Sequence, residues 1–398
     1  MEEDLSLDSL VIRRVVYRYH RRNFSFDLSQ ALFSSAGVDV GTSLLLALIA
    51  EHVPLSGFSR VVDFGCGTGT LGICLAAAGS CELEAIDRDA LAVGFTARNA
   101  RLNGVDRVVL RHDVSPGEPA GGRELIVSNL PAKVGAPVLR LLVAAMARRS
   151  AAAGGVCAAV IVKPLADLLR SQLEALGAQT LADRRTANHE ALLFTCPEAP
   201  EISVSPDDFV RDEQQFMGPD RPYRIRTVYN LPEFDGLSFA TALAFDLMRG
   251  YTVSGSLLVY GVGQGHLVVG AAQRIHGLAP ITIADRDRLA LDTTSANAER
   301  LGVALADVRS VPGVGSLARA EQSAATGAWL VINDVPVSAT SWNDSVATAA
   351  VRLLGPAGKL LLVSRSTAVS RFERSTTGLV RLAERRMRGF RAALYRRR

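Results

Sequence analysis

The chain has 398 residues, a net charge of +4 and 48% apolar residues. That length is too great for one ordinary core, so we expect two domains, each apolar enough to bury a sizeable core. No apolar run reaches the roughly 18 residues of a membrane helix, and no signal-peptide core follows MEEDLSLD. We therefore expect a cytoplasmic protein without a membrane partner.

Cysteines and histidines give no sign of a disulfide frame or a metal site. The five cysteines are odd in number and contain no C-x-x-C pair, and the six histidines form no H-E-x-x-H motif. We expect no structural metal.

Positive charge gathers in two stretches. Residues 9–25 hold five arginines and no acid, and residues 365–398 hold eleven arginines against two glutamates. Both stretches suit contact with phosphates, and a solvated surface is an equally weighted alternative. The candidate substrate contacts are Arg21, Arg22, Arg385 and Arg386.

The first elements are short strands over residues 9–34 and then a helix. In Leu32–Leu46, LFSSAGVDVGTSLLL, Gly37 and Gly41 mark a turn and Thr42 is a suitable cap for the apolar helix that follows.

The next stretch, VVDFGCGTGT over 61–70, predicts a buried strand, a glycine turn and a helix start. Glycines at 65, 67 and 69 allow a sharp turn and a close ligand, and the helix offers backbone N–H groups. Thr70 stands where a dinucleotide fingerprint needs its third glycine. Asp63, two residues before the first glycine, suits a cationic, amine-bearing ligand instead.

Strand and helix patterns alternate from Arg60 to Thr195. They predict an α/β fold with a mainly parallel sheet covered on both faces, with ligands at the carboxyl ends of the strands. Asp87, about 20 residues after the turn, is placed for ribose hydroxyls. Asp113 and Asn129 end the next two strands.

Together, DFGCGTG, Asp87, Asp113 and the run Ser128-Asn129-Leu130-Pro131 resemble a class I S-adenosylmethionine (SAM) methyltransferase. A glycine turn of another α/β fold is the less favoured alternative. The resemblance implies a Rossmann-like, doubly wound domain with SAM as cofactor. It implies the following cofactor-binding residues: Thr42, Asp63, Gly65, Cys66, Gly67, Gly69, Asp87, Arg88, Asp113, Val114 and Asn129.

Residues 32–46 also resemble the F-S-x-x-G-x-D-x-G-T segment of the ribosomal RNA guanine-N2 methyltransferases. In that family the segment lies over the cofactor, which implies that Asp39 and Thr42 help to enclose SAM. A simple helix cap is the alternative for each residue.

The family's N-P-P-Y/F tetrad corresponds to Asn129-Leu130-Pro131-Ala132. By this resemblance the Asn129 amide and the Leu130 carbonyl accept the two N–H bonds of the acceptor amine, and Pro131 stiffens the turn. Ala132 cannot stack on a base as the family's aromatic does. Lys133 is a candidate partner for a phosphate or carboxylate of the substrate.

Residues 223–398 repeat the first half. LLVYGVGQGHL echoes VVDFGCGTGTL, and LVINDVP echoes LIVSNLP. We match Tyr260 with Asp63, Ser238 with Asp39, Asp285 with Asp87 and Asp334 with Asn129. Because the acid before the glycines is lost, we expect a degenerate copy that supports, dimerises or binds substrate. Tandem halves again resemble the guanine-N2 enzymes, although there the worn half comes first.

These observations predict three segments: a SAM-binding domain with a basic leading segment (1–200), a linker (201–222) and a degenerate copy (223–398). The leading function is a SAM-dependent N-methyltransferase of RNA, like the rRNA guanine-N2 enzymes. One alternative is methylation of a small molecule or a protein side chain. The other is a non-enzymatic SAM- or RNA-binding module. A homodimer is possible.

Overall fold

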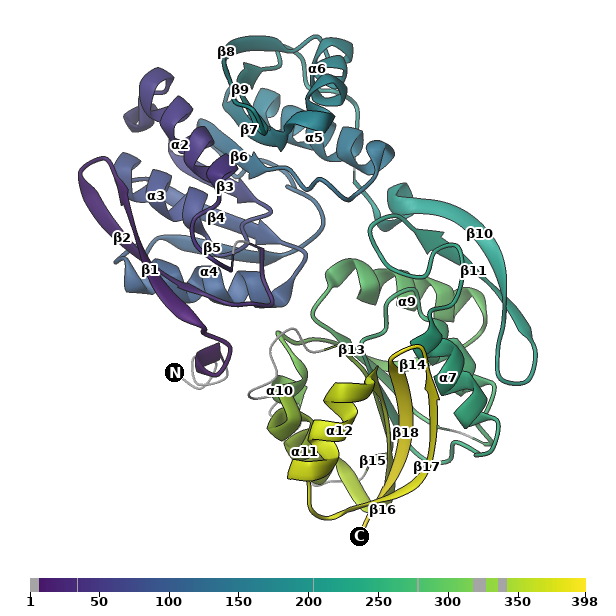
Figure 1. Ribbon diagram of the computed structural model, residues 1–398. Coiled ribbons are helices and arrows are strands. Elements are labelled where there is room, and N and C mark those ends of the chain that lie inside the picture. The colour runs from purple at the N-terminus through teal and green to yellow at the C-terminus, as the bar shows by residue number, and fades with distance from the viewer. Residues whose placement is uncertain (1–6, 34, 203, 278, 318–326, 336–341) are drawn as a thin grey trace. The chain divides into compact units, whose positions relative to one another are not determined.

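The computed structural model describes residues 7–33, 35–202, 204–277, 279–317, 327–335 and 342–398. The chain forms two compact units, Met1–Phe209 and Val210–Arg398 (Figure 1). In the described part of the chain, no helix combines the length and apolar character needed to cross a membrane.

The first unit alternates strands and helices as the sequence predicts. Its strands are β1 (Arg13–Tyr19), β2 (Arg22–Leu28), β3 (Arg60–Phe64), β4 (Glu82–Asp87), β5 (Val108–His112), β6 (Glu124–Asn129), β7 (Val156–Val162), β8 (Gln179–Arg185) and β9 (His189–Thr195). Its helices are α2 (Val40–His52), α3 (Thr70–Gly79), α4 (Ala90–Leu102), α5 (Ala136–Ala152) and α6 (Ala166–Ala175).

The seven-stranded sheet of this unit has the order β5-β4-β3-β6-β7-β9-β8. Strands β5, β4, β3, β6 and β7 pair in parallel, and β9 runs antiparallel to both of its neighbours. From β3 the chain adds β4 and β5 on one side of the sheet and then β6 and β7 on the other. The carboxyl ends of β3 and β6 therefore flank the switch point where α/β folds bind ligands.

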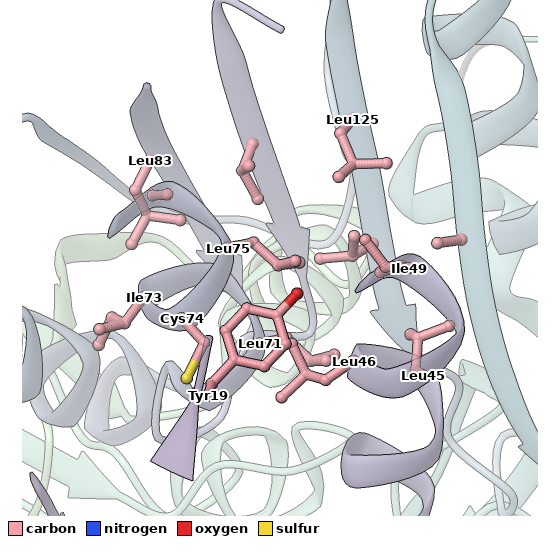
Figure 2. Packing of buried hydrophobic residues seen from close by; sticks show 14 of the residues in the cluster. Tyr19, Leu45, Leu46, Ile49, Leu71, Ile73, Cys74, Leu75, Leu83 and Leu125 are labelled. Carbon is pink, nitrogen blue, oxygen red and sulfur yellow. The ribbon is translucent and has the colours of Figure 1, made fainter. Parts of the chain in front are cut away.

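Apolar residues of alternate strand positions form the core of the first unit. Figure 2 shows Leu45, Leu46 and Ile49 of α2 and Leu71 and Leu75 of α3 among the buried side chains over the sheet. The opposite face carries α5, where Cys157 of β7 contacts the Met146 carbonyl. Burial on both faces explains why these strands are continuous apolar runs.

The second unit repeats this architecture, with the sheet order β14-β13-β12-β15-β16-β18-β17. Its strands are β10 (Val210–Met217), β11 (Pro222–Val228), β12 (Leu257–Tyr260), β13 (Ile281–Asp285), β14 (Leu305–Ser310), β15 (Gly327–Asn333), β16 (Leu354–Arg365), β17 (Leu379–Met387) and β18 (Phe390–Arg397). Its helices are α7 (Phe239–Met248), α8 (His266–Ala272), α9 (Arg288–Arg300), α10 (Val314–Leu317), α11 (Trp342–Leu353) and α12 (Ser366–Ser375).

Part of the predicted linker is a strand. Residues 210–217 form β10, which pairs with β11 as β1 pairs with β2 at the start of the first unit. The polar, acidic composition of this stretch reflects the exposed side of a two-stranded ribbon.

Strand register corrects two of the predicted correspondences between the copies. Phe64 pairs with Ile86, one residue before Asp87, and Tyr260 pairs with Ala284, one residue before Asp285. Tyr260 therefore stands in the place of Phe64, and Val259 is the counterpart of Asp63.

The strand register also corrects the predicted match of Asp334 with Asn129. Asp63 pairs with Val127 and its counterpart Val259 pairs with Val331, so two residues further on Asn129 corresponds to Asn333. Asp334 is thus the counterpart of Leu130. The sequence echo misled by one residue because the second copy has an extra position before its proline.

Candidate cofactor and acceptor site

The glycine loop joins β3 to α3 in a backbone path that side chains rarely adopt. Gly65, Gly67 and Gly69 have φ values of 79°, 56° and 81°. A Cβ added at Gly65 or Gly67 would meet no atom within 4 Å, whereas one at Gly69 would touch Ile73 and Thr96. The loop is therefore open on the side of its first two glycines and packed at its third. Cys66, between the first two glycines, is buried, and its Sγ accepts a hydrogen bond from the Thr96 hydroxyl at 3.3 Å.

Asp63 lies buried at the end of β3 with one carboxylate oxygen engaged. Oδ2 accepts the Gly72 N–H of α3 at 2.8 Å. Oδ1 is buried and has no hydrogen-bond partner among the described residues. Burial, followed by the nearby Asp87 carboxylate, raises the Asp63 pKa to about 7. An orphaned acceptor of this kind suits a cationic donor.

Asp87 ties the glycine loop to the start of α4. Its Oδ2 accepts the Gly67 N–H at 2.9 Å, and its Oδ1 accepts the Asp89 N–H at 2.9 Å. The neighbouring Arg88 carbonyl accepts a hydrogen bond from the His112 ring at 2.7 Å. The predicted ribose acid thus also shapes the loop.

Asp113 and Val114 follow β5 at the same edge of the sheet. The Asp113 carboxylate pairs with Arg111 at 2.6 Å and accepts the Ser115 N–H at 3.1 Å, and the Val114 side chain is buried. These two residues therefore sit on a loop whose conformation is held by side-chain contacts.

Asn129, at the end of β6, has a fixed amide orientation. Its Nδ2 donates to Asp39 Oδ2 at 2.9 Å and to Thr42 Oγ1 at 3.2 Å. Among the described residues, nothing donates to Asn129 Oδ1. The following Leu130 uses its N–H on the Val160 carbonyl at 2.9 Å. Pro131, Ala132 and Lys133 are exposed beyond it.

The residue that caps α2 is Asp39 and not Thr42. The Asp39 side chain accepts the Thr42 N–H at 3.2 Å, and Thr42 lies within the first turn of the helix. The predicted pair from the leading segment therefore contacts the Asn129 side chain directly.

The predicted basic contacts are partly used inside their own units. Arg22 donates to the Asn103 carbonyl and lies 5.0 Å from the Phe24 ring centre, whereas Arg21 is exposed in the turn between β1 and β2. Arg385 pairs with Asp246 at 2.6 Å and Arg386 pairs with Glu384 at 3.0 Å.

Sequence reasoning missed His189 at the start of β9. A Cβ added at Gly41 would lie 2.9 Å from Asp39 Oδ2 and 3.1 Å from the His189 ring. The His189 Nδ1 atom is buried and has no hydrogen-bond partner in the part of the chain that the structure describes. Nothing in the sequence pattern links this strand to residues 39–42, since the contact depends on the antiparallel placement of β9 beside β7.

The second unit keeps the loop geometry but fills the space over it. Asp285 accepts the Val262 and Asp287 N–H groups, much as Asp87 accepts those of Gly67 and Asp89. Gly261 has the same φ of 79° as Gly65, yet a Cβ there would lie 1.9 Å from the Asn333 carbonyl oxygen. The backbone at the end of β15 thus occupies the position that is open in the first unit.

In the described residues, no group of three or more histidine, cysteine or acidic side chains is arranged to hold a metal ion. All five cysteines are free thiols and are buried.

The fold and the loop at the switch point define two tandem domains of the class I methyltransferase type. Over 98% of this chain and 99% of the other, the structure matches a T. thermophilus 16S rRNA N2 methyltransferase solved with AdoMet and guanosine. The TM-score is 0.70 at 16% identity, which establishes likeness of fold.

Residues 23–174 match the family described as Methyltransferase small domain. The matched residues lie within the first unit.

Curated relatives resemble part of this chain. Ribosomal RNA small subunit methyltransferase C of Chromohalobacter salexigens is 33% identical over 114 residues, which are 29% of this chain and 34% of that protein. Ribosomal protein L11 methyltransferase of Alkalilimnicola ehrlichii is 38% identical over 111 residues, which are 27% of this chain and 36% of that protein. The chain thus spans about a third of the length of the curated relatives it matches.

Proposed function

We propose that the first unit is a SAM-dependent N-methyltransferase that acts on an exocyclic amine of RNA, like the rRNA guanine-N2 enzymes. The observation that carries the proposal is the fixed Asn129 amide at the end of β6, next to the glycine loop after β3. It combines an amine acceptor site with a cofactor loop at one edge of one sheet.

The residues present fit the cofactor. The orphaned Asp63 Oδ1 suits the ammonium of an amino acid, and the open face at Gly65 and Gly67 allows close approach to the backbone. Asp87 carries further acceptor capacity for ribose hydroxyls, and Asp113 with Val114 is proposed for the base. Thr42 beside Asn129, Cys66 and Gly69 in the glycine loop, and Arg88 after Asp87 complete the proposed cofactor set.

SAM, when bound, supplies a methyl group on a positively charged sulfur. The chain's part is orientation: Asn129 Oδ1 and the Leu130 carbonyl accept the two N–H bonds of the amine, which turns its lone pair toward the methyl. Holding the reacting atoms near 3 Å in line supplies much of the rate. Pro131 restricts the backbone that carries the Leu130 carbonyl.

An RNA substrate is supported by the kind of protein that the chain resembles. The Chromohalobacter relative is named for methylation of small-subunit rRNA, and the T. thermophilus structure holds guanosine. Lys133 and Arg21 are exposed and suit phosphates.

A protein amine is the second candidate. The exposed Ala132 offers no aromatic face for a base, and several relatives are named for methylation of ribosomal protein L11.

The test is transfer of radiolabelled methyl from SAM to total RNA, to ribosomal protein and to a small-metabolite extract. Label in RNA that is lost in Asn129→Ala supports the proposal. Label only in protein or metabolites moves the assignment to that substrate, and label in none of them, with SAM still bound, supports a binding module.

A further inference from the structure

We propose that Asp39 is a positioning residue whose carboxylate fixes the orientation of the Asn129 amide. The inference rests on the proposed function and deepens it. It gives the segment before α2 a role in binding the amine that is methylated, in addition to enclosing the cofactor.

The hydrogen bonds between the two side chains allow one arrangement. An ionised carboxylate only accepts, so the atom that faces Asp39 Oδ2 at 2.9 Å must be the amide nitrogen of Asn129. Thr42 Oγ1 takes the second N–H at 3.2 Å. With both N–H groups engaged, Oδ1 is left as an acceptor for an amine.

The second unit separates this task from helix capping. Ser238 caps α7 through the Thr241 N–H at 3.2 Å, the same distance at which Asp39 caps α2. A serine is therefore sufficient for the cap. The counterpart of Asn129 in that unit, Asn333, instead donates to the Gly261 carbonyl at 3.4 Å.

Gly41 gives an independent observation. A Cβ there would lie 2.9 Å from Asp39 Oδ2 and 3.1 Å from the His189 ring, so the carboxylate would have to move. The second unit has Ala240 at this position, next to its shorter Ser238. The first unit thus combines an aspartate cap with a glycine two residues later, and the second combines a serine cap with an alanine. This is expected if the glycine makes room for a carboxylate that accepts a hydrogen bond from Asn129.

Three substitutions and one control test the proposal by cofactor titration and single-turnover methyl transfer. Asp39→Ser keeps the cap and should lower the transfer rate about 10²-fold, with unchanged SAM affinity. Asp39→Asn keeps an oxygen acceptor and should recover most of that loss. Gly41→Ala should lower the transfer rate in the same way as Asp39→Ser. Gly37→Ala is the control and should behave as wild type, because a Cβ there would meet nothing within 4 Å.

Side-chain amide resonances of Asn129, assigned by their absence in Asn129→Ala, give a readout that needs no activity. In Asp39→Ser they should move toward the values of a solvated amide. Unmoved resonances, a wild-type transfer rate, or a loss of SAM affinity equal to the loss of rate would each overturn the positioning role. Failure of the proposed function itself would show as absence of transfer in the wild-type chain, with the resonance shift still deciding the Asp39–Asn129 relationship.

Discussion

The Asp63 carboxylate and the Gly72 backbone lock β3 to α3. Oδ2 of Asp63 accepts the Gly72 N–H at 2.8 Å, and a Cβ at Gly72 would lie 2.8 Å from the Asp63 Cβ and 2.5 Å from Leu83. Glycine at position 72 therefore lets the helix approach the strand closely enough to bury the acid. Within the described residues, the second carboxylate oxygen has no hydrogen-bond partner.

We predict that Asp63→Ala abolishes SAM binding, because it removes the buried acceptor for the ligand's ammonium. Calorimetry on the intact chain should show one strong site that disappears in this variant. Gly263→Ala is the matched control in the second unit, where Val259 stands in place of the acid, and it should leave binding intact. Two equal sites, or loss of binding in the control, would contradict a single site in the first unit.

The raised Asp63 pKa predicts a pH dependence of stability. With a pKa of about 7 in the folded chain against about 4 when exposed, the folded state holds this proton more tightly than the unfolded state. The contribution of Asp63 therefore stabilises the apo chain at low pH and is lost as pH rises from about 4 to about 7, by up to about 4 kcal/mol. Urea unfolding from pH 4 to 8 should show a flatter profile in Asp63→Asn, and identical profiles would refute the assignment.

The Asn129→Ala variant should lose turnover more than cofactor affinity. Its amide oxygen aligns the amine in the transition state, so the loss should appear in the chemical step. Single-turnover rates and a SAM titration measure the two effects separately. Lys133→Ala, four residues on and exposed, is the control that should raise KM for RNA with little change in kcat; an unchanged rate in Asn129→Ala would remove this loop from catalysis.

The fold followed from the sequence because the glycine turn and the alternation of apolar runs are local signals. Local echoes also paired Tyr260 with Asp63 and Asp334 with Asn129, and both pairings were wrong by one residue. Only the hydrogen-bonded partners of each strand, such as Ala284 beside Tyr260, fix that register.

The candidate site was predictable in part for a related reason. Acids at strand ends are visible in the pattern, whereas the contact between Asp39 and Asn129 joins side chains 90 residues apart. His189 of β9 also lies next to Gly41. Neither contact produces a periodic pattern in the sequence. Such contacts depend on how α2 and β9 pack on β7, which the whole sheet determines.

Gly65 and Gly261 form a matched pair for substitution by alanine. Both have a φ of 79°, so alanine carries the same backbone cost, about 1–2 kcal/mol, in each. Only Gly261 would also press a Cβ against the Asn333 carbonyl. We predict that Gly261→Ala destabilises its unit by clearly more than Gly65→Ala destabilises the other, while only Gly65→Ala impairs SAM binding. Urea unfolding and calorimetry decide this, and equal losses of stability would mean that the second loop is not filled.

The last prediction concerns the arginines and RNA. If RNA is the substrate, affinity should fall steeply with salt, because each phosphate neutralised by the chain releases counterions. The candidate arginines differ in how available they are to phosphates. Arg21 is exposed in a turn. Arg385 is paired with Asp246, and Arg386 is paired with Glu384. A charge that is compensated by a neighbouring acid attracts phosphate less.

We therefore expect Arg21→Ala to weaken RNA binding and to reduce the slope of log affinity against log salt by about 1. Arg385→Gln should have a smaller effect, because it removes a cation that Asp246 already balances, and Asp246→Asn should strengthen binding by releasing that cation. SAM affinity should stay constant in all three variants, since none of these residues belongs to the proposed cofactor set. Filter binding of RNA from 50 to 300 mM salt measures the slopes. A shallow slope in the wild-type chain, or slopes that none of these changes alters, would favour an amine on a protein or small molecule as the acceptor.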